Sequence, residues 1–592
     1  MKYAKTSALL GVVLSTFSMG AADAAVILVG DSTAGIQAAD RITVSTTWTS
    51  NNVYRLQDQI YVESGATLTI QAGTVIASTP ANQGSLAICR GAKIFALGTQ
   101  ENPIIFTSTA DVATWLPLAG HPTGKNPKTG TWREAANEWG NVTIMGRAYI
   151  SKSIGVAGNS ATFNANNVAP MEGIVLPAGN NNGLYGGGDD NDDSGTLRYV
   201  SFRYGGKVVG LTNELNGLSL GGLGRETDIH HIDIMNNVDD GIEIWGGTVS
   251  LKYVNIWNIG DDSFDIDQGW RGKAQFGLLV QGYSVDAAQG SGVGDNLVET
   301  DGAENSDAQP VTTAVIYNFT ALGQPTPGAG DHGTAWRDNA RIQYRNCIFM
   351  NLGERLIGFD NLDGDGSQGY GFNGTLSWAN TWTTNFNAAP AHANDPANPA
   401  LFYTTQTSGK LAEITDSIFY QNPDPAAYTE SDARGVTIAG GNNAALHNVV
   451  ANLQPIATIN RGPAVVKGGK TMLPVIGLDP RAINAASPSF AQAPNDGFFT
   501  PALYRGAFSA TKNWLCGWTA ADAFGYIIQP AGACKLPCPG DLDSNNTTNV
   551  NDLLGVINAW GVCLGCPQDI NGDGQVNVVD LLGVINGWGA CP

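Results

Sequence analysis

The sequence predicts an all-β fold, a parallel β-helix in which the chain winds as a solenoid, followed by a small α-helical module at the C-terminus. Three observations support this prediction. Glycine accounts for 75 of 592 residues and charged residues for only 14%, which is typical of short strands joined by tight turns. A segment of about 22 residues repeats in the middle of the chain, and an acidic loop with an apolar helix occurs twice at its end.

The N-terminal segment has the pattern of a secretory signal peptide. In MKYAKTSALLGVVLSTFSMGAADAA, Lys2 and Lys5 precede an apolar stretch through Phe17, and ADA at 22–24 gives a small-x-small cleavage site. We therefore expect residues 1–24 to be removed and the mature protein to be secreted, either extracellular or at the cell surface. Because no later apolar run reaches the roughly 20 residues that span a bilayer, we expect no membrane insertion.

Charge and cysteine content restrict the class of partner. The net charge of -21 argues against binding to nucleic acid or to anionic membranes, and it is compatible with calcium. Six of the eight cysteines lie in the last 77 residues. This is expected for a small module held together by disulfides in an oxidising compartment.

Residues 25–510 form the predicted β-helix domain. From Thr67 the segments ATLTIQAGTVIAS and GSLAICRGAKIFALGTQENPIIFTST alternate apolar with small or polar residues, which indicates strands. Later segments, beginning at Ala340, Glu413 and Ala444, contain single strands separated by long polar inserts. Such inserts usually become loops on one flank of a solenoid, where binding sites tend to form.

The internal repeat decides between two kinds of β fold. DIHHIDIMNNVDDGIEIWGG (from Asp228) and SLKYVNIWNIGDDSFDIDQG (from Ser250) superpose at an offset of 22, and TLRYVSFRY (from Thr196) aligns with their first halves. A β-sandwich would not keep similar residues at a fixed offset, because its strands pair antiparallel. One coil of a parallel solenoid has this length. The predicted apolar columns are Val200, Ile232 and Val254, and Phe202, Ile234 and Ile256.

After a predicted linker at 511–537, residues 538–592 contain two loops with oxygen-bearing side chains at alternating positions. A calcium ion takes six to eight oxygen ligands, and this alternation allows a loop to surround it. Each loop leads into LLGVIN, an amphipathic helix of about two turns. The predicted calcium ligands are Asp541, Asp543, Asn545, Thr547, Asn549 and Asp552 in the first loop, and Asp569, Asn571, Asp573, Gln575, Asn577 and Asp580 in the second.

One loop and helix cannot cover their own apolar face, so we expect the two helices to pack on each other. The expected contacts join Leu553, Val556, Ile557 and Trp560 to Leu581, Val584, Ile585 and Trp588. The spacing of cysteines around each loop is the same, and it predicts the disulfides Cys538–Cys563 and Cys566–Cys591, with Cys516 and Cys534 able to form a third.

This repeated pattern resembles the dockerin type I module of secreted polysaccharide-degrading assemblies, which has two calcium loops, each followed by a helix, and Asp at position 12. The resemblance implies a cohesin-like or cell-surface protein as partner. The chain differs from dockerins at Ile557-Asn558 and Ile585-Asn586, where dockerins usually carry basic residues.

The large domain resembles a family of secreted bacterial proteins expected to form right-handed parallel β-helices. The matching segments include GATLTIQAGTVI, WGNVTIMGRA, DDGIEIWGGTVSLKYV and GDDSFDIDQGWRGKAQF. This resemblance implies the right-handed fold and no particular activity.

Stacked acidic residues are the strongest candidates for chemistry. With coils about 4.8 Å apart, Asp239 would lie beside Asp261, Asp240 beside Asp262, and Glu243 beside Asp265, with Asp267 next to them. Carboxylates this close cannot all stay ionised and unpaired. Three resolutions are open: a bound calcium ion, a shared proton in an acid/base pair such as glycosidases use, or neutralisation by Arg271 and Lys273.

We take Asp240, Asp262 and Asp265 as candidate catalytic residues, and His231 and Asp233 as further available groups. Trp245, Trp257 and Trp270 would stack on sugar rings if exposed, or cap the solenoid if buried. The predicted function is binding or cleavage of polysaccharide, the latter as a glycoside hydrolase or polysaccharide lyase. The rival hypothesis is a non-catalytic cell-surface or adhesion protein tethered through its C-terminal module.

Overall fold

The computed structural model describes residues 25–590 except for residue 34, 152–162, 175, 177, 211–212, 284–293, 304–307, 331, 360–368, 372–375, 387–400, 423–444, 530–539, 543–546, 563–567, 569 and 571–574. Residues 1–24, the expected signal peptide, lie outside this range. No helix in the described part of the chain is long and apolar enough to cross a membrane.

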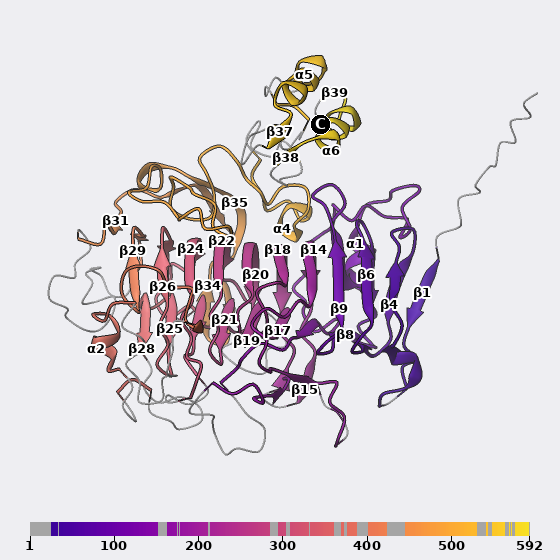
Figure 1. Ribbon diagram of the computed structural model, residues 1–592, viewed down its shortest axis with the longest axis horizontal. Coiled ribbons are helices and arrows are strands. Elements are labelled where there is room, and N and C mark those ends of the chain that lie inside the picture. The colour runs from indigo at the N-terminus through magenta and orange to yellow at the C-terminus, as the bar shows by residue number, and fades with distance from the viewer. Residues whose placement is uncertain are drawn as a thin grey trace, which may run out of the picture.

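The described chain is a parallel β-helix, as the 22-residue repeat predicts (Figure 1). One face is an eight-stranded parallel sheet, formed in spatial order by β2 (Arg41–Ile42), β5 (Gln59–Val62), β8 (Ser85–Ile88), β11 (Val142–Met145), β17 (Leu218–Leu223), β19 (Ile242–Gly247), β21 (Phe264–Asp267) and β23 (Val298–Thr300). We call it the eight-stranded sheet. A short parallel pair, β25 (Thr334–Trp336) and β28 (Ile357–Phe359), lies beside β23.

The strands of the remaining surface join into one 17-stranded sheet. Its early members are short: β1 (Val26–Val29), β3 (Thr46–Trp48), β4 (Val53–Leu56), β6 (Thr67–Gln71), β7 (Val75–Ser78), β9 (Lys93–Leu97) and β10 (Ile104–Ser108). Five long strands follow: β14 (Gly195–Arg203), β18 (Asp228–Asn237), β20 (Ser250–Ile259), β22 (Lys273–Val280) and β24 (Val315–Leu322). The last members are β26 (Gln343–Arg345), β27 (Ile348–Met350), β29 (Glu413–Thr415), β30 (Ile418–Tyr420) and β31 (Val449–Val450).

Both apolar columns predicted from the repeat are confirmed by the strand register. Val200 pairs with Ile232 and Ile232 with Val254, while Phe202, Ile234 and Ile256 pair in the same way. All of these side chains are buried in the main core. Because burial of one such side chain contributes roughly 1.5–3 kcal/mol, the stacked columns are a main source of stability.

Four of the five long strands, β14, β18, β20 and β22, carry a ring-bearing residue with a positive φ near the middle of the strand. Tyr199, His231, Tyr253 and Phe276 have φ between 50° and 61°. Their rings stack face to face from coil to coil, with centroids 4.2, 4.3 and 5.0 Å apart. Left-handed backbone is unfavourable for these residues, so the stacking offsets part of the strain at each of these positions.

Inserts and the end of the domain carry the remaining elements. These are η1 (Ala38–Asp40), α1 (Thr109–Thr114), β12 (Ala169–Pro170), β13 (Leu184–Tyr185), β15 (Val208–Gly210), β16 (Asn213–Glu214), α2 (Trp378–Thr381), β32 (Ile456–Arg461), β33 (Val465–Lys467), β34 (Lys470–Met472), β35 (Val475–Ala482), η4 (Asn484–Ala486) and α4 (Ala520–Ala523). Leu515, Cys516 and Ala520 are buried against the outside of the long strands. This half of the predicted linker is therefore part of the folded β-helix domain.

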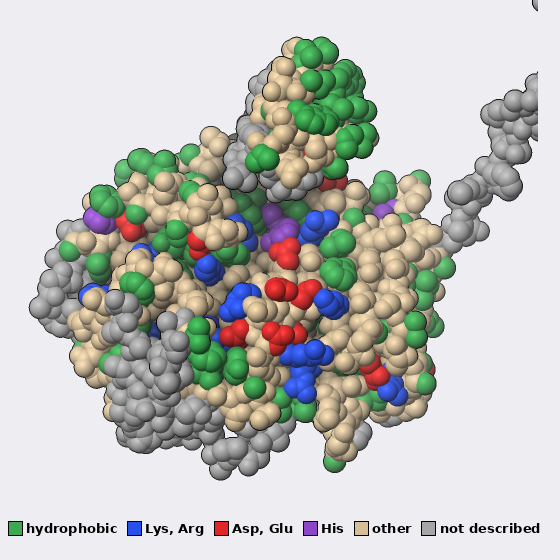
Figure 2. All heavy atoms as spheres, viewed as in Figure 1, with side chains coloured by type: hydrophobic (Ala, Val, Ile, Leu, Met, Phe, Trp, Pro, Cys, Tyr) green, Lys and Arg blue, Asp and Glu red, His purple; other side chains and the backbone are tan. Residues whose placement is uncertain are grey.

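The C-terminal module contains β36 (Thr547–Thr548), α5 (Val550–Asn558), β37 (Gly561–Val562), β38 (Gln575–Val576), α6 (Val578–Asn586) and β39 (Gly589–Ala590). The two helices pack on each other, and Val556 and Val584 are buried between them. One part of the expected contact is wrong, because four large side chains are about half exposed: Ile557, Trp560, Ile585 and Trp588. Figure 2 shows hydrophobic side chains gathered on one side of this module.

Candidate functional site

A row of acidic side chains runs along the outside of the eight-stranded sheet. Ile242 and Ile244 flank Glu243 on β19, and Ile266 follows Asp265 on β21. These isoleucines point into the core. Because side chains alternate along a strand, Glu243 and Asp265 point outward. The register pairs Glu243 with Asp265, as predicted, and Asp265 with Glu299 of the next coil. Carboxylates from three successive coils therefore lie side by side.

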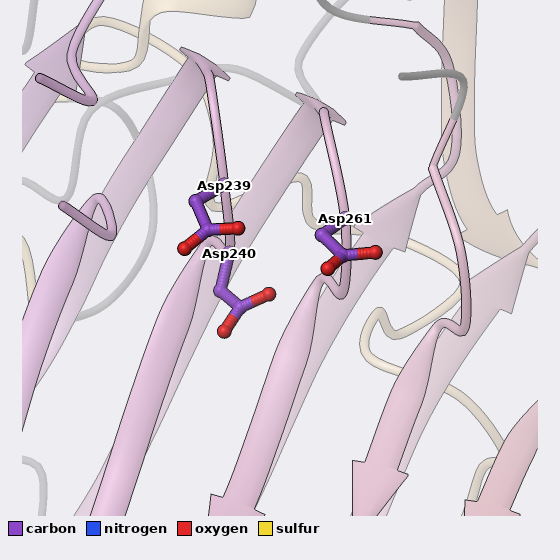
Figure 3. A group of neighbouring side chains, drawn as sticks. All are labelled: Asp239, Asp240 and Asp261. Atoms are coloured by element: carbon purple, nitrogen blue, oxygen red, sulfur yellow. The ribbon is translucent and has the colours of Figure 1, made fainter. Parts of the chain in front are cut away.

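More carboxylates come from the turns that precede β19 and β21. Asp239 and Asp240 lie on one turn, and Asp261 lies on the equivalent turn of the next coil (Figure 3). The backbone N–H of Asp262 donates to Oδ1 of Asp240 at 2.9 Å, and the N–H of Asn296 donates to Oδ1 of Asp262 at 2.5 Å. The predicted vertical neighbours are thus in direct contact.

We call the set Asp239, Asp240, Glu243, Asp261, Asp262, Asp265 and Asp295 the acid cluster. In three groups within it, one oxygen from each residue lies within 4.8 Å of the others. These groups are Asp239, Asp240 and Asp261; Asp240, Glu243 and Asp265; and Asp261, Asp262 and Asp295.

The cluster favours protonation in the absence of a counter-ion. Burial, and next the neighbouring carboxylates, raise the pKa of Asp240 and of Asp262 well above the usual value. Burial also raises the pKa of Asp261 to about 6 and that of Glu172, which faces the cluster, to about 7. The charged state is therefore costly at neutral pH unless a cation compensates it.

The donor set fits a hard cation. Every side chain in the three groups offers carboxylate oxygen, the ligand type that calcium prefers. Oδ1 of Asp261 and Oδ1 of Asp265 are buried without a hydrogen-bond partner among the described residues. Buried polar atoms are normally paired, so these two oxygens are available as ligands.

The prediction that Arg271 and Lys273 neutralise the stacked carboxylates is wrong. Arg271 donates to both oxygens of Asp190 at 2.6 and 2.7 Å, and Nζ of Lys273 lies 2.6 Å from Asp496. A different cation, Arg337, faces the cluster. It forms ion pairs with Glu299 and Asp301, and it lowers the pKa of Asp265 against the larger effect of burial.

A cavity of about 340 Å³ adjoins the acid cluster beyond β23. Its lining includes the acidic residues Asp295 and Glu299 and the basic residues His332, Arg337 and Arg355. Phe359 borders the cavity with 45% of its surface exposed, and its ring stacks on Trp378 at 4.6 Å. The cavity thus combines hydrogen-bond donors, acceptors and one aromatic face, as sugar-sized ligands require.

Several of these residues are missing from the sequence prediction. Glu299 follows Asp265 at an offset of 34 rather than 22, because an insert lengthens that coil. The sequence pattern that could have identified Glu299 is the alternation of apolar and polar residues in LVET, which resembles that in SFDID one coil earlier. Glu172 comes from an insert without periodicity, so no sequence pattern identifies it.

Other predicted candidates have structural roles in this fold. His231 belongs to the row of stacked rings on the long strands, and Asp233 is buried beneath α4. Trp245, Trp257 and Trp270 are all buried, so they are not exposed platforms for sugar rings. Two cysteines outside the C-terminal region, Cys89 and Cys347, are also buried, and burial raises the pKa values of their thiols to about 12, so both stay protonated.

The two predicted calcium loops are described in part. Asp543, Asn545, Asp569, Asn571 and Asp573 lie outside the described residues, as do the cysteines Cys534, Cys538, Cys563, Cys566 and Cys591. Asn549 and Asn577 are the N-caps of α5 and α6. Asp552 accepts from the N–H groups of Leu542 and Asn549, and Asp580 accepts from those of Ile570 and Asn577. Each position-12 carboxylate therefore ties the start of its loop to its helix.

Fold and site together define an all-β parallel β-helix protein with a buried carboxylate cluster on one sheet. The family model described as pectate-lyase like beta helix domain matches residues 40–120 and 123–416, more than half of the chain. The chain therefore belongs to this family of pectate-lyase-like β-helix proteins. Neither the curated proteins nor the solved structures contain a match.

Proposed function

We propose that the protein is a secreted, calcium-dependent polysaccharide-binding protein that also cleaves its ligand. Calcium would be held by the acid cluster, and the polysaccharide would lie in the adjoining cavity. The observation that carries this proposal is the set of three carboxylate groups, each drawn from two successive coils, with oxygens within 4.8 Å of one another inside each group. The family of the β-helix domain supports polysaccharide as the class of ligand.

The chain's own residues would divide the work as follows. Asp240, Glu243 and Asp265 would hold the ion, which supplies positive charge to polarise a carboxylate or carbonyl group of the sugar. Arg355 would bind an acidic substituent, and the exposed ring of Phe359 would pack on a sugar face. His332, 3.7 Å from Glu354, is the titratable group in the cavity suited to move a proton.

The burial of the cluster favours a second candidate, a structural cation that only stabilises the solenoid. Asp262 and Asp265 are 3% and 7% exposed, which leaves little direct access for a polymer. The triple variant Asp240→Asn, Asp262→Asn, Asp265→Asn separates the two functions, with Asp193→Asn as a control for loss of a carboxylate outside the cluster. Loss of turnover on acidic glycans with retained folding supports the first function. Loss of the calcium-dependent gain in thermal stability, in a protein that never cleaves any glycan, supports the second.

We also propose that the C-terminal module binds calcium through its two loops and tethers the protein to a cohesin-like or cell-surface partner. The half-exposed Trp560 and Trp588 supply apolar surface for such a contact. Calcium titration of the full chain, followed by tryptophan fluorescence, tests this proposal. The variant Asp541→Asn, Asp569→Asn should lose the fluorescence change, and an unchanged titration would contradict the proposal.

A further inference from the structure

A second cavity, of about 450 Å³, lies at the ends of β8 and β11, within the part of the chain that matches the family model. Its volume is in the range of small-molecule sites, roughly 300–1,000 Å³. The side chains of Arg90 and Arg147 line it, together with those of Ser64, Asn181 and Asn182 and the backbone of the glycine-rich loop 186–188. We call it the arginine cavity.

The backbone around the arginine cavity is shaped to hold two guanidinium groups. Arg90 donates from Nη1 to the carbonyl oxygen of Gly186 at 2.9 Å. Gly91 has a φ of +86°, and a Cβ at this position would lie 1.9 Å from Nη2 of Arg147. Gly91 thus gives Arg147 room beside Arg90, and any other residue would displace it.

The positive charge of this cavity is only partly compensated. Neither guanidinium forms a salt bridge with a carboxylate in the described part of the chain. Buried Asp192 attracts both arginines, but its carboxylate is engaged by the backbone N–H of Arg147 and by the Ser194 hydroxyl. Asp189 on the rim accepts from the N–H of Asn191 at 3.0 Å. Burial, and then the charge of Arg147, lower the pKa of Arg90, which is the effect of two close cations.

We propose that the arginine cavity binds the oxyanion of an acidic sugar, with Arg90 and Arg147 on the anionic group and Ser64 and Asn181 on the ring hydroxyls. Two guanidinium groups bind carboxylate and sulfate oxygens through paired, charge-assisted hydrogen bonds. The site goes beyond the proposed function, because it lies at other strands than the acid cluster and uses no calcium. Cys89, which also lines the cavity, stays a neutral thiol and contributes packing only.

Calorimetry on the full-length protein tests this site after calcium has been removed and the chelator dialysed away. The probes are a trimer of galacturonic acid, a sulfated galactose trimer, a neutral galactose trimer and inorganic sulfate. One or both acidic trimers should bind, and which one binds identifies the anionic group. The neutral trimer should not bind, and inorganic sulfate should bind at least tenfold more weakly. Equal affinity for inorganic sulfate, or no binding of either acidic trimer, would overturn the assignment.

Variants connect the binding to this cavity. Arg147 is exposed, so Arg147→Gln should fold, and the loss of one charged hydrogen-bonding group should weaken binding by about tenfold or more. Arg225→Gln, an exposed arginine that hydrogen-bonds Asn191, is the matched control and should leave the affinity unchanged. The triple acid-cluster variant should also bind the acidic trimer normally, which separates this site from the proposed calcium site. Unaltered affinity in Arg147→Gln would refute the proposal even if the calcium site were correct.

Discussion

Two buried carboxylates in the same coil have opposite surroundings. Asp233, on β18, accepts hydrogen bonds from Ser201 at 2.5 Å, Asn255 at 2.7 Å and the N–H of Ala520 at 2.7 Å. Asp240, seven residues later, lies among other carboxylates, and its nearest donor is the N–H of Asp262. The first carboxylate is matched by donors within the protein, whereas the second lies in a group of carboxylates that must take up protons or a cation.

This difference separates structural from functional burial. A buried charge is tolerated when the fold supplies its hydrogen bonds, and Asp233 attaches α4 to the long strands in this way. Carboxylates that crowd one another without such donors reduce stability, so their presence points to a ligand. The comparison leads to predictions of opposite sign for changes in the two regions.

The largest effect is expected from Asp233→Ala. The substitution leaves the donors of Ser201, Asn255 and Ala520 buried and unpaired, which should lower the free energy of unfolding by about 3 kcal/mol or more. Thermal melts with and without calcium should show the same loss. A loss that appears only in calcium would mean that Asp233 belongs to the cation site.

The triple variant Asp240→Asn, Asp262→Asn, Asp265→Asn should act in the opposite direction. Without calcium it should melt at a higher temperature than the wild type, because amides remove the repulsion between buried carboxylates. A calcium concentration of 100 times Kd should stabilise the wild type by about 2.7 kcal/mol through this site and leave the variant without that gain. Equal gains in both proteins would place calcium elsewhere.

The pH dependence should have the same origin. The pKa values of Asp261 and Glu172 are raised to about 6 and about 7, so the folded protein binds protons more tightly than the unfolded chain. Their stabilising contribution is complete below about pH 4 and is lost as the pH rises through 6 to 7. The calcium-free protein should therefore be less stable at pH 8 than at pH 5, by about 3–4 kcal/mol if both groups contribute fully. Melting curves of the triple variant should depend less on pH.

The smallest effect is expected from Asp193→Asn, the control outside the acid cluster. Its ion pair with Lys93, at 2.5 Å, is partly exposed on both sides, so its loss should change stability by less than about 0.5 kcal/mol. Calcium should stabilise this variant as it does the wild type. A larger change would show that loss of any carboxylate on this surface alters stability. The effect of the triple variant could then not be attributed to the acid cluster.

The sequence predicts the parts of this molecule that repeat. Similar residues recur at a fixed offset because coils stack, and this predicts the column of Val200, Ile232 and Val254 as well as the contact between Asp240 and Asp262. Prediction fails where an insert changes the length of a coil, as it does before Glu299. It also fails for contacts distant in sequence, such as the pair of Arg271 with Asp190.

The C-terminal helices show a second limit. Their LLGVIN segments have apolar residues on more than one side, so periodicity does not tell which side is buried. The structure buries Val556 and Val584 and leaves Trp560 and Trp588 about half exposed, since two helices of nine residues cannot cover both stripes.

Crystals grown with calcium would test the central claim, that the carboxylates of successive coils form a cation site. We predict an anomalous difference peak between Asp240, Glu243 and Asp265, with oxygen ligands at about 2.3–2.6 Å. Ordered carboxylates with no such peak, or paired through shared protons at neutral pH in saturating calcium, would contradict it.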